Sequence, residues 1–100
     1  MISAGALLLL TQVVVWHAYS GAEQSALEQV VREYNSTQRE VAVEAIAVPY
    51  GSFADKLQAA IPRGHGPDAF IAAHDLIGQW VGQGLLARVD DDPAVQQTLT

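Results

Sequence analysis

Apolar and polar residues along this chain form blocks that predict a strand followed by a helix, three times in succession. The first block, Val13–Trp16, is a β-branched run suited to a strand buried on both faces. Ser20 and Glu23 have the spacing of a capping box, so we expect a helix to begin there and to end at Asn35, with Ser36 and Thr37. Its apolar residues recur at helical spacing, at Ala22, Ala26, Leu27, Val30, Val31 and Tyr34.

The second block begins with Val41–Val48, a predicted strand that is stopped by Pro49. Ser52 and Asp55 have the spacing of another capping box, which predicts the start of a second helix. That helix carries apolar residues at four-residue steps, namely Phe53, Leu57 and Ile61. Pro62 and Gly64 are expected to close it.

The third block begins with a strand over Ala69–Ala73, and a helix is predicted over about residues 76–83. Gly84 is placed to serve as its left-handed C-cap. The three strands begin near residues 13, 41 and 68, a spacing that favours parallel strands joined by helical crossovers. Such crossovers are right-handed in nearly all proteins, so we predict an α/β fold with helices on both faces of one sheet.

Composition limits the size of the fold and its partners. A chain of 100 residues, half of them apolar, can form one compact unit and is below the size at which chains divide into domains. The net charge of −6, with only five basic residues, leaves no cationic patch for nucleic acid. The absence of cysteine excludes disulfides, thiolate metal sites and a lipid-attachment cysteine.

Residues 1–12 are set apart from the predicted fold. Ile2–Leu10 is apolar and has the length of a signal-peptide core, which is too short for a comfortable bilayer span. No basic residue precedes it and no clear cleavage site follows it, so we expect either a signal-peptide remnant or an extended first strand or disordered tail. The predicted lobe occupies residues 13–89, and residues 90–100 are expected to be a linker or the start of another element.

Candidate functional residues follow the carboxyl ends of the three strands, which meet at one edge of a parallel sheet. Six of them carry polar or aromatic groups that could bind a ligand: His17, Tyr19, Ser20, Tyr50, His74 and Asp75. Asp75 is the sharpest candidate, because an ionised carboxylate can accept hydrogen bonds from two neighbouring hydroxyls, although it could equally cap a helix. Aromatic rings beside such acceptors suit a sugar. Trp16 and Trp80 are interpreted as packing residues, the latter on one helix face with Ile77 and Val81.

Catalytic and cofactor sites are not indicated by the sequence. The Gly64–Gly66 turn precedes a strand, whereas a phosphate-binding glycine loop follows one. His17, His65 and His74 lack the short spacings of a metal site. We therefore expect neither a metal nor another cofactor, and no enzyme activity.

The order of these motifs resembles the first lobe of the extracellular solute-binding proteins of ABC importers, family 1, and most of all the maltose and maltodextrin-binding branch. The resemblance covers residues 13–89 and rests on Val14–Trp16 with Ser20–Gly21, Leu27 and Val30 through Tyr34–Asn35, Phe53 with Lys56–Leu57, Gly66–Asp68, Ala73–Asp75 and Gly84–Leu86. It implies a lobe of the type II periplasmic-binding-protein fold, with the first strand between the second and third. By this likeness Asp75 contacts sugar hydroxyls in a cleft between two lobes, and an exported, periplasmic protein delivers the sugar to a membrane permease without itself spanning the membrane.

Two departures leave the ligand open. Tyr19–Gly21 stands where the maltose-binding branch carries charged residues, and Leu76 stands where that branch has an arginine. The loop His17–Gly21 also looks like that of binders of other sugars or of glycerol phosphate. Two further classes stay open: an α/β enzyme whose catalytic groups lie beyond residue 100, and a binding domain fused to a permease.

Overall fold

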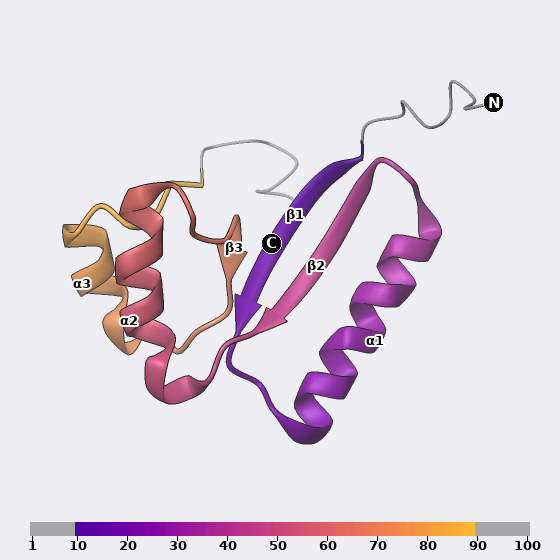
Figure 1. The fold of residues 1–100 in the computed structure, drawn as a ribbon, viewed down its shortest axis with the longest axis horizontal. Coiled ribbons are helices and arrows are strands. Elements are labelled where there is room, and N and C mark those ends of the chain that lie inside the picture. Colours follow the sequence, from indigo (N-terminus) through magenta and orange to yellow (C-terminus); the bar gives the residue numbers. More distant parts are fainter. Residues whose placement is uncertain (1–9, 90–100) are drawn as a thin grey trace.

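The computed structural model describes residues 10–89, which form a three-stranded parallel sheet with helices on both faces (Figure 1). Its elements are β1 (Thr11–His17), α1 (Gly21–Thr37), β2 (Val41–Ala47), α2 (Tyr50–Ala60), a 3-10 turn η2 (Ile61–Arg63), β3 (Ala69–Phe70), a second 3-10 turn η3 (His74–Leu76) and α3 (Ile77–Gly82). The predicted alternation of strands and helices is confirmed.

The strand order is β2-β1-β3, so the first strand is central, as the resemblance implied. β1 and β2 pair from Thr11 opposite Val41 to His17 opposite Ala47. β3 is shorter than the predicted Ala69–Ala73, because only Ala69 and Phe70 pair with β1, opposite Val15 and Trp16. β1 itself begins at Thr11, two residues before the expected start of the lobe.

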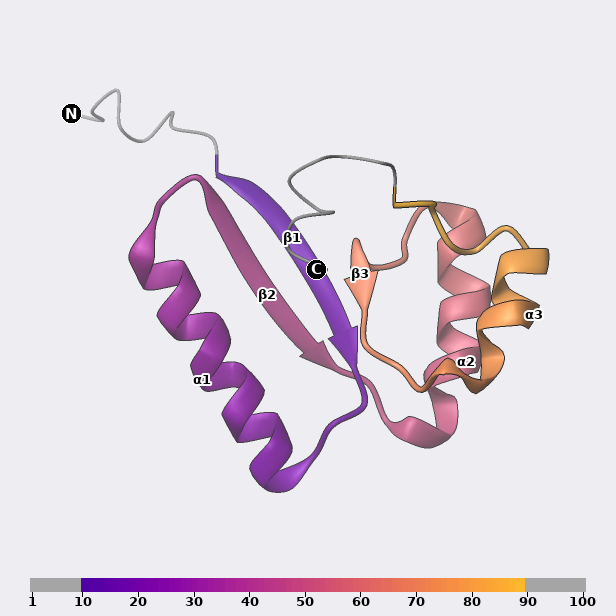
Figure 2. The ribbon, with the colours of Figure 1, turned by 180° about the vertical axis from the view of Figure 1, so that it is seen from behind.

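The helices lie in two layers, with the sheet between them. The crossover from β1 to β2 runs in the opposite direction to the one from β2 to β3, so right-handed connections place α1 and α2 on opposite faces. Figure 1 and the reverse view in Figure 2 show α1 on one side of the sheet and α2 with α3 on the other. This three-layer arrangement confirms the predicted fold class.

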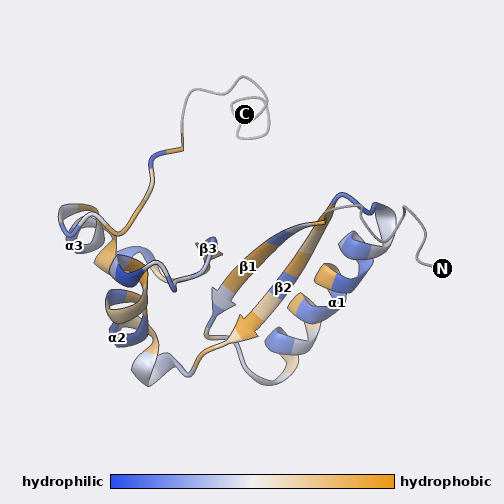
Figure 3. Ribbon diagram, turned by 45° about the horizontal axis from the view of Figure 1, so that its top comes forward, coloured by the Kyte–Doolittle hydropathy of each residue, from blue (hydrophilic) through white to orange (hydrophobic). Residues whose placement is uncertain are grey.

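The core lies between the sheet and α2. It is built from four buried side chains, Val48, Phe53, Leu57 and Trp80, against which Trp16 and Phe70 pack. The ring of Phe70 stands edge-on to those of Phe53 and Trp80, at centroid distances of 6.1 and 5.4 Å. Figure 3 shows the hydrophobic residues running along β1 and β2. The packing roles expected for Trp16 and Trp80 are confirmed.

Two predicted apolar helix faces are only partly correct. In α1 no residue is fully buried, and Val30 and Tyr34 are 60% and 46% exposed. Leu27 and Val31 of the predicted face are half-buried, together with Gln24, Glu28 and Asn35. Because α1 packs on an edge strand, its contact stripe is narrow and excludes part of the apolar set. In α3 only Trp80 is buried, whereas Ile77 and Val81 are exposed.

Both capping-box predictions are wrong. Ser20 is the N-cap of α1, but its side chain makes no capping hydrogen bond. α2 begins at Tyr50, two residues before Ser52, and its N-cap is Pro49, whose side chain has no acceptor for a capping hydrogen bond. The predicted ends are confirmed, since Gly64 and Gly84 adopt left-handed φ values of 76° and 73°.

The outer edge of β2 is covered by two amide side chains. Asn35 donates to the carbonyl of Val43 and accepts from its N–H, both at 2.9 Å. Gln38 donates to the carbonyl of Val41 at 2.7 Å and accepts from its N–H at 2.8 Å. Each amide therefore replaces one peptide group of a neighbouring strand, which blunts the edge against pairing with another chain.

The proposed signal-peptide remnant falls largely on residues 1–9, and the proposed linker on residues 90–100, both outside the described residues. Across residues 10–89, no helix has both the length and the apolar character needed to cross a bilayer.

Candidate functional site

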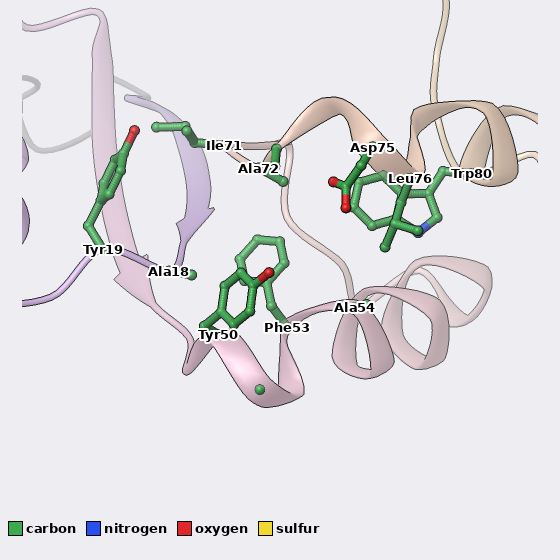
Figure 4. A pocket seen from close by; sticks show the side chains of 12 residues that line it. Ala18, Tyr19, Tyr50, Phe53, Ala54, Ile71, Ala72, Asp75, Leu76 and Trp80 are labelled. Carbon is green, nitrogen blue, oxygen red and sulfur yellow. The ribbon is translucent and has the colours of Figure 1, made fainter.

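A pocket of about 570 Å³ lies at the carboxyl edge of the sheet (Figure 4), within the usual volume range for small-molecule sites. The segments after all three strands contribute to it, because parallel strands end at the same edge. Its lining residues are Ala18, Tyr19, Tyr50, Gly51, Phe53, Ala54, Ile71, Ala72, Ala73, Asp75, Leu76 and Trp80.

Backbone hydrogen bonds from the end of β1 hold these segments together. The carbonyl of His17 accepts from the N–H of Val48 at 2.8 Å, just before α2 begins. The carbonyl of Trp16 accepts from the N–H of Ile71 at 2.9 Å, just after β3. The central strand thus fixes the spacing of the two outer segments of the pocket, so the pocket rests on the sheet rather than on free loops.

Three of the six candidate residues line the pocket. Tyr19 lies in the loop after β1, Tyr50 is the first residue of α2, and Asp75 lies in η3. Figure 4 shows the two tyrosine rings on one side of the view and Asp75 beside Trp80 on the other. Tyr50 is 81% exposed, so nearly all of its ring is available to a ligand.

The other three candidates do not line the pocket. Ser20 is exposed at the start of α1, and His74 is exposed in η3 beside Asp75. His17 is fully buried, at the end of β1. Within residues 10–89, the side chains of Ser20, His74 and His17 therefore do not form part of the pocket wall.

The remainder of the lining is largely apolar, and none of it was among the six candidate residues. Ile71, Ala72 and Ala73 follow β3, while Phe53 and Trp80 join the pocket to the core. A signal was available for Phe53, since it stands three residues after Tyr50 in a helix and so shares its face. The same spacing argument links Leu76 to Trp80, four residues later.

The charge of the pocket wall is simple. Within residues 10–89, Asp75 is the only carboxylate in the lining, and no basic side chain belongs to it. No group of three or more potential metal ligands occurs in the same part of the chain. The wall therefore offers aromatic faces, two phenol hydroxyls and one anionic acceptor, a set suited to an uncharged ligand with hydroxyl groups.

Comparison with known proteins agrees with this geometry. The family of bacterial extracellular solute-binding proteins matches residues 18–97. The chain belongs to this family. As a solute-binding protein, it has its pocket where the fold brings together the ends of its parallel strands.

Two proteins that are similar to this solute-binding protein are named for the sugars that they bind. It is 35% identical over 80 residues to the maltotriose-binding protein of Pyrococcus abyssi (strain GE5 / Orsay), and the match covers 80% of this chain and 17% of that protein. The crystal structure of the cyclic alpha-maltosyl-1,6-maltose binding protein from Arthrobacter globiformis aligns with a TM-score of 0.74 and 32% identity. That alignment covers 84% of this chain and 22% of the other. The chain thus spans about a fifth of the length of these proteins.

Proposed function

We propose that this chain forms part of the binding wall for a maltodextrin-like carbohydrate in the substrate-binding component of an ABC sugar importer. The observation that carries the proposal is the presence of Tyr19, Tyr50 and Asp75 in one pocket at the carboxyl edge of the sheet. The sugar named for each of the two relatives supports the same ligand class.

The chemistry of a pyranose matches these groups. Its C–H faces pack on aromatic rings, for which the exposed ring of Tyr50 is available. Its hydroxyls donate to carboxylate oxygens, and Asp75 can accept from two neighbouring hydroxyls in charge-assisted bonds. Tyrosine hydroxyls both donate and accept, so Tyr19 can pair with a hydroxyl in either orientation.

A glycerol phosphate ligand is the second candidate, since the loop after β1 also looks like that of such binders. The charge of the wall argues against it. Asp75 would repel a phosphate, and none of the basic residues within residues 10–89 lines the pocket to offset that repulsion. A neutral sugar meets no such opposition, so the wall favours the carbohydrate.

The proposed role is capture and delivery rather than catalysis. In this proposal the complete protein is exported, closes a second lobe over the sugar and passes it to membrane permease subunits, so that closure excludes water from the site. The alternative is an α/β enzyme with catalytic groups beyond residue 100. Turnover of a labelled maltodextrin by the complete gene product would favour the enzyme, whereas release of the unchanged sugar supports the binder.

Titration calorimetry of the complete gene product with maltotriose tests the ligand assignment. Asp75→Ala should weaken binding by about 1.5–3 kcal/mol, the range for hydrogen bonds to a charged group. Asp55→Ala is the matched control, because Asp55 is an exposed carboxylate of α2 outside the pocket. Unchanged affinity in Asp75→Ala removes this residue from the site, and failure of the unmodified protein to bind maltodextrins rejects the proposed function.

A further inference from the structure

His17 is the one polar side chain that is fully buried within the described part of the chain. It ends β1, directly before the loop that carries Ala18 and Tyr19 into the pocket. Its own side chain does not belong to the pocket lining. Any contribution of this imidazole to ligand binding must therefore pass through its neighbours.

The imidazole makes two contacts with Tyr19. Its Nδ1 accepts a hydrogen bond from the backbone N–H of Tyr19 at 3.1 Å. Its ring lies 5.6 Å from the Tyr19 ring, with an angle of 32° between the planes. Because Nδ1 accepts a hydrogen bond, the neutral ring carries its hydrogen on Nε2. The hydrogen bond to Nδ1 therefore favours the Nε2–H tautomer of His17.

That tautomer leaves a buried donor without a partner. Nε2 has no hydrogen-bond partner among residues 10–89 and is closed to solvent. An unpaired buried donor is destabilising, whereas a leucine would fill a similar volume without that penalty. The hydrogen bond that His17 does make is through Nδ1, so Nδ1 is the atom through which the imidazole acts on Tyr19.

We propose that His17 is a positioning residue, which holds the loop after β1 so that Tyr19 is presented to the ligand. This inference rests on the proposed sugar-binding function. The imidazole accepts a hydrogen bond from the Tyr19 backbone and contacts the Tyr19 ring. The phenol is therefore held in place before the sugar binds. Holding a side chain in its bound geometry raises affinity, because less conformational freedom is lost on binding.

The test compares two substitutions in the complete gene product, with maltotriose binding measured by calorimetry. His17→Leu removes the acceptor and should weaken binding about tenfold, the factor that corresponds to ordering one flexible side chain. His17→Asn is the rescue variant, because its side-chain oxygen can take the place of Nδ1, and it should stay within about threefold of the unmodified protein. A purely structural role would not separate the two variants in this way.

Replacing the tyrosine itself shows whether His17 acts through it. In a Tyr19→Ala background, His17→Leu should change affinity by less than about twofold, because the ring that it positions is gone. Equal affinities of His17→Leu and the unmodified protein overturn the inference and leave the sugar-binding proposal intact. Additive losses in the double variant also overturn it. Failure of the unmodified protein to bind maltotriose or another maltodextrin rejects both the inference and the sugar-binding proposal.

A measurement on the unmodified protein decides the matter if His17→Leu does not fold. The ¹⁵N chemical shifts of the His17 ring report which nitrogen carries the hydrogen, and the inference requires it on Nε2. A hydrogen on Nδ1 excludes the bond to Tyr19 and overturns the inference. The expected result is the Nε2–H tautomer together with slow exchange of the Tyr19 amide.

Discussion

Asn35→Ala should destabilise the fold by uncovering the outer edge of β2. The substitution removes two hydrogen bonds of 2.9 Å, one to the N–H and one to the carbonyl of Val43. Hydrogen bonds between neutral groups contribute about 0.5–1.5 kcal/mol each, which gives about 1–3 kcal/mol for the pair. Water can replace the amide at an edge strand, so we expect the lower part of that range, about 1–2 kcal/mol.

Urea unfolding followed by circular dichroism measures this loss in the complete gene product. Ser36→Ala is the matched control, because Ser36 is an exposed neighbour whose hydroxyl only donates to the carbonyl of Glu33. It should change stability by no more than about 0.5 kcal/mol, as surface substitutions usually do. An unchanged slope of the transition shows that the substitution altered stability rather than the compactness of either state.

Hydrogen exchange gives a local readout of the same substitution. The Val43 amide should exchange faster in Asn35→Ala than in the unmodified protein, because its acceptor has been removed. If Asn35→Ala is as stable as Ser36→Ala and the Val43 amide stays equally protected, the amide does not cover the edge. The variant should also scatter more light on concentration, since an open edge invites pairing.

Two further predictions concern a glycine and the single wall of the pocket. Gly66→Ala should destabilise by about 1–3 kcal/mol in thermal unfolding, because a Cβ there would lie 2.5 Å from Ile61 Cγ1 and 3.1 Å from Ile61 Cα. Gly51→Ala, which meets nothing within 4 Å, should be neutral or stabilising, and equal effects of the two substitutions would contradict this. The isolated 100-residue chain should bind maltotriose no more tightly than about 1 mM in a fluorescence titration, because one wall offers few contacts against the entropy of association. Saturable micromolar binding by a monomer would show that a second wall is unnecessary.

Local sequence patterns were sufficient to predict the elements and their order. β-branched runs such as Val13–Trp16 mark strands, although these four residues are half-buried rather than buried on both faces as expected. Left-handed glycines such as Gly64 mark helix ends. Both signals depend on the conformational preferences of single residues. The edge at which Tyr19, Tyr50 and Asp75 gather also followed from the sequence, since parallel strands must end together. The capping boxes failed, because a suitable spacing does not oblige a side chain to make the bond.

Only the tertiary structure decided which neighbouring residues face the ligand. Asp75 lines the pocket and His74 does not, although they are adjacent in the chain, because the path of η3 sets their directions. His17 lies behind the pocket rather than in it, since the loop after β1 folds back over its ring. The spacing of apolar residues in the sequence predicts which residues share one face of a helix or strand. Which side becomes buried depends on contacts between segments far apart in the chain, and these exist only once the sheet has formed.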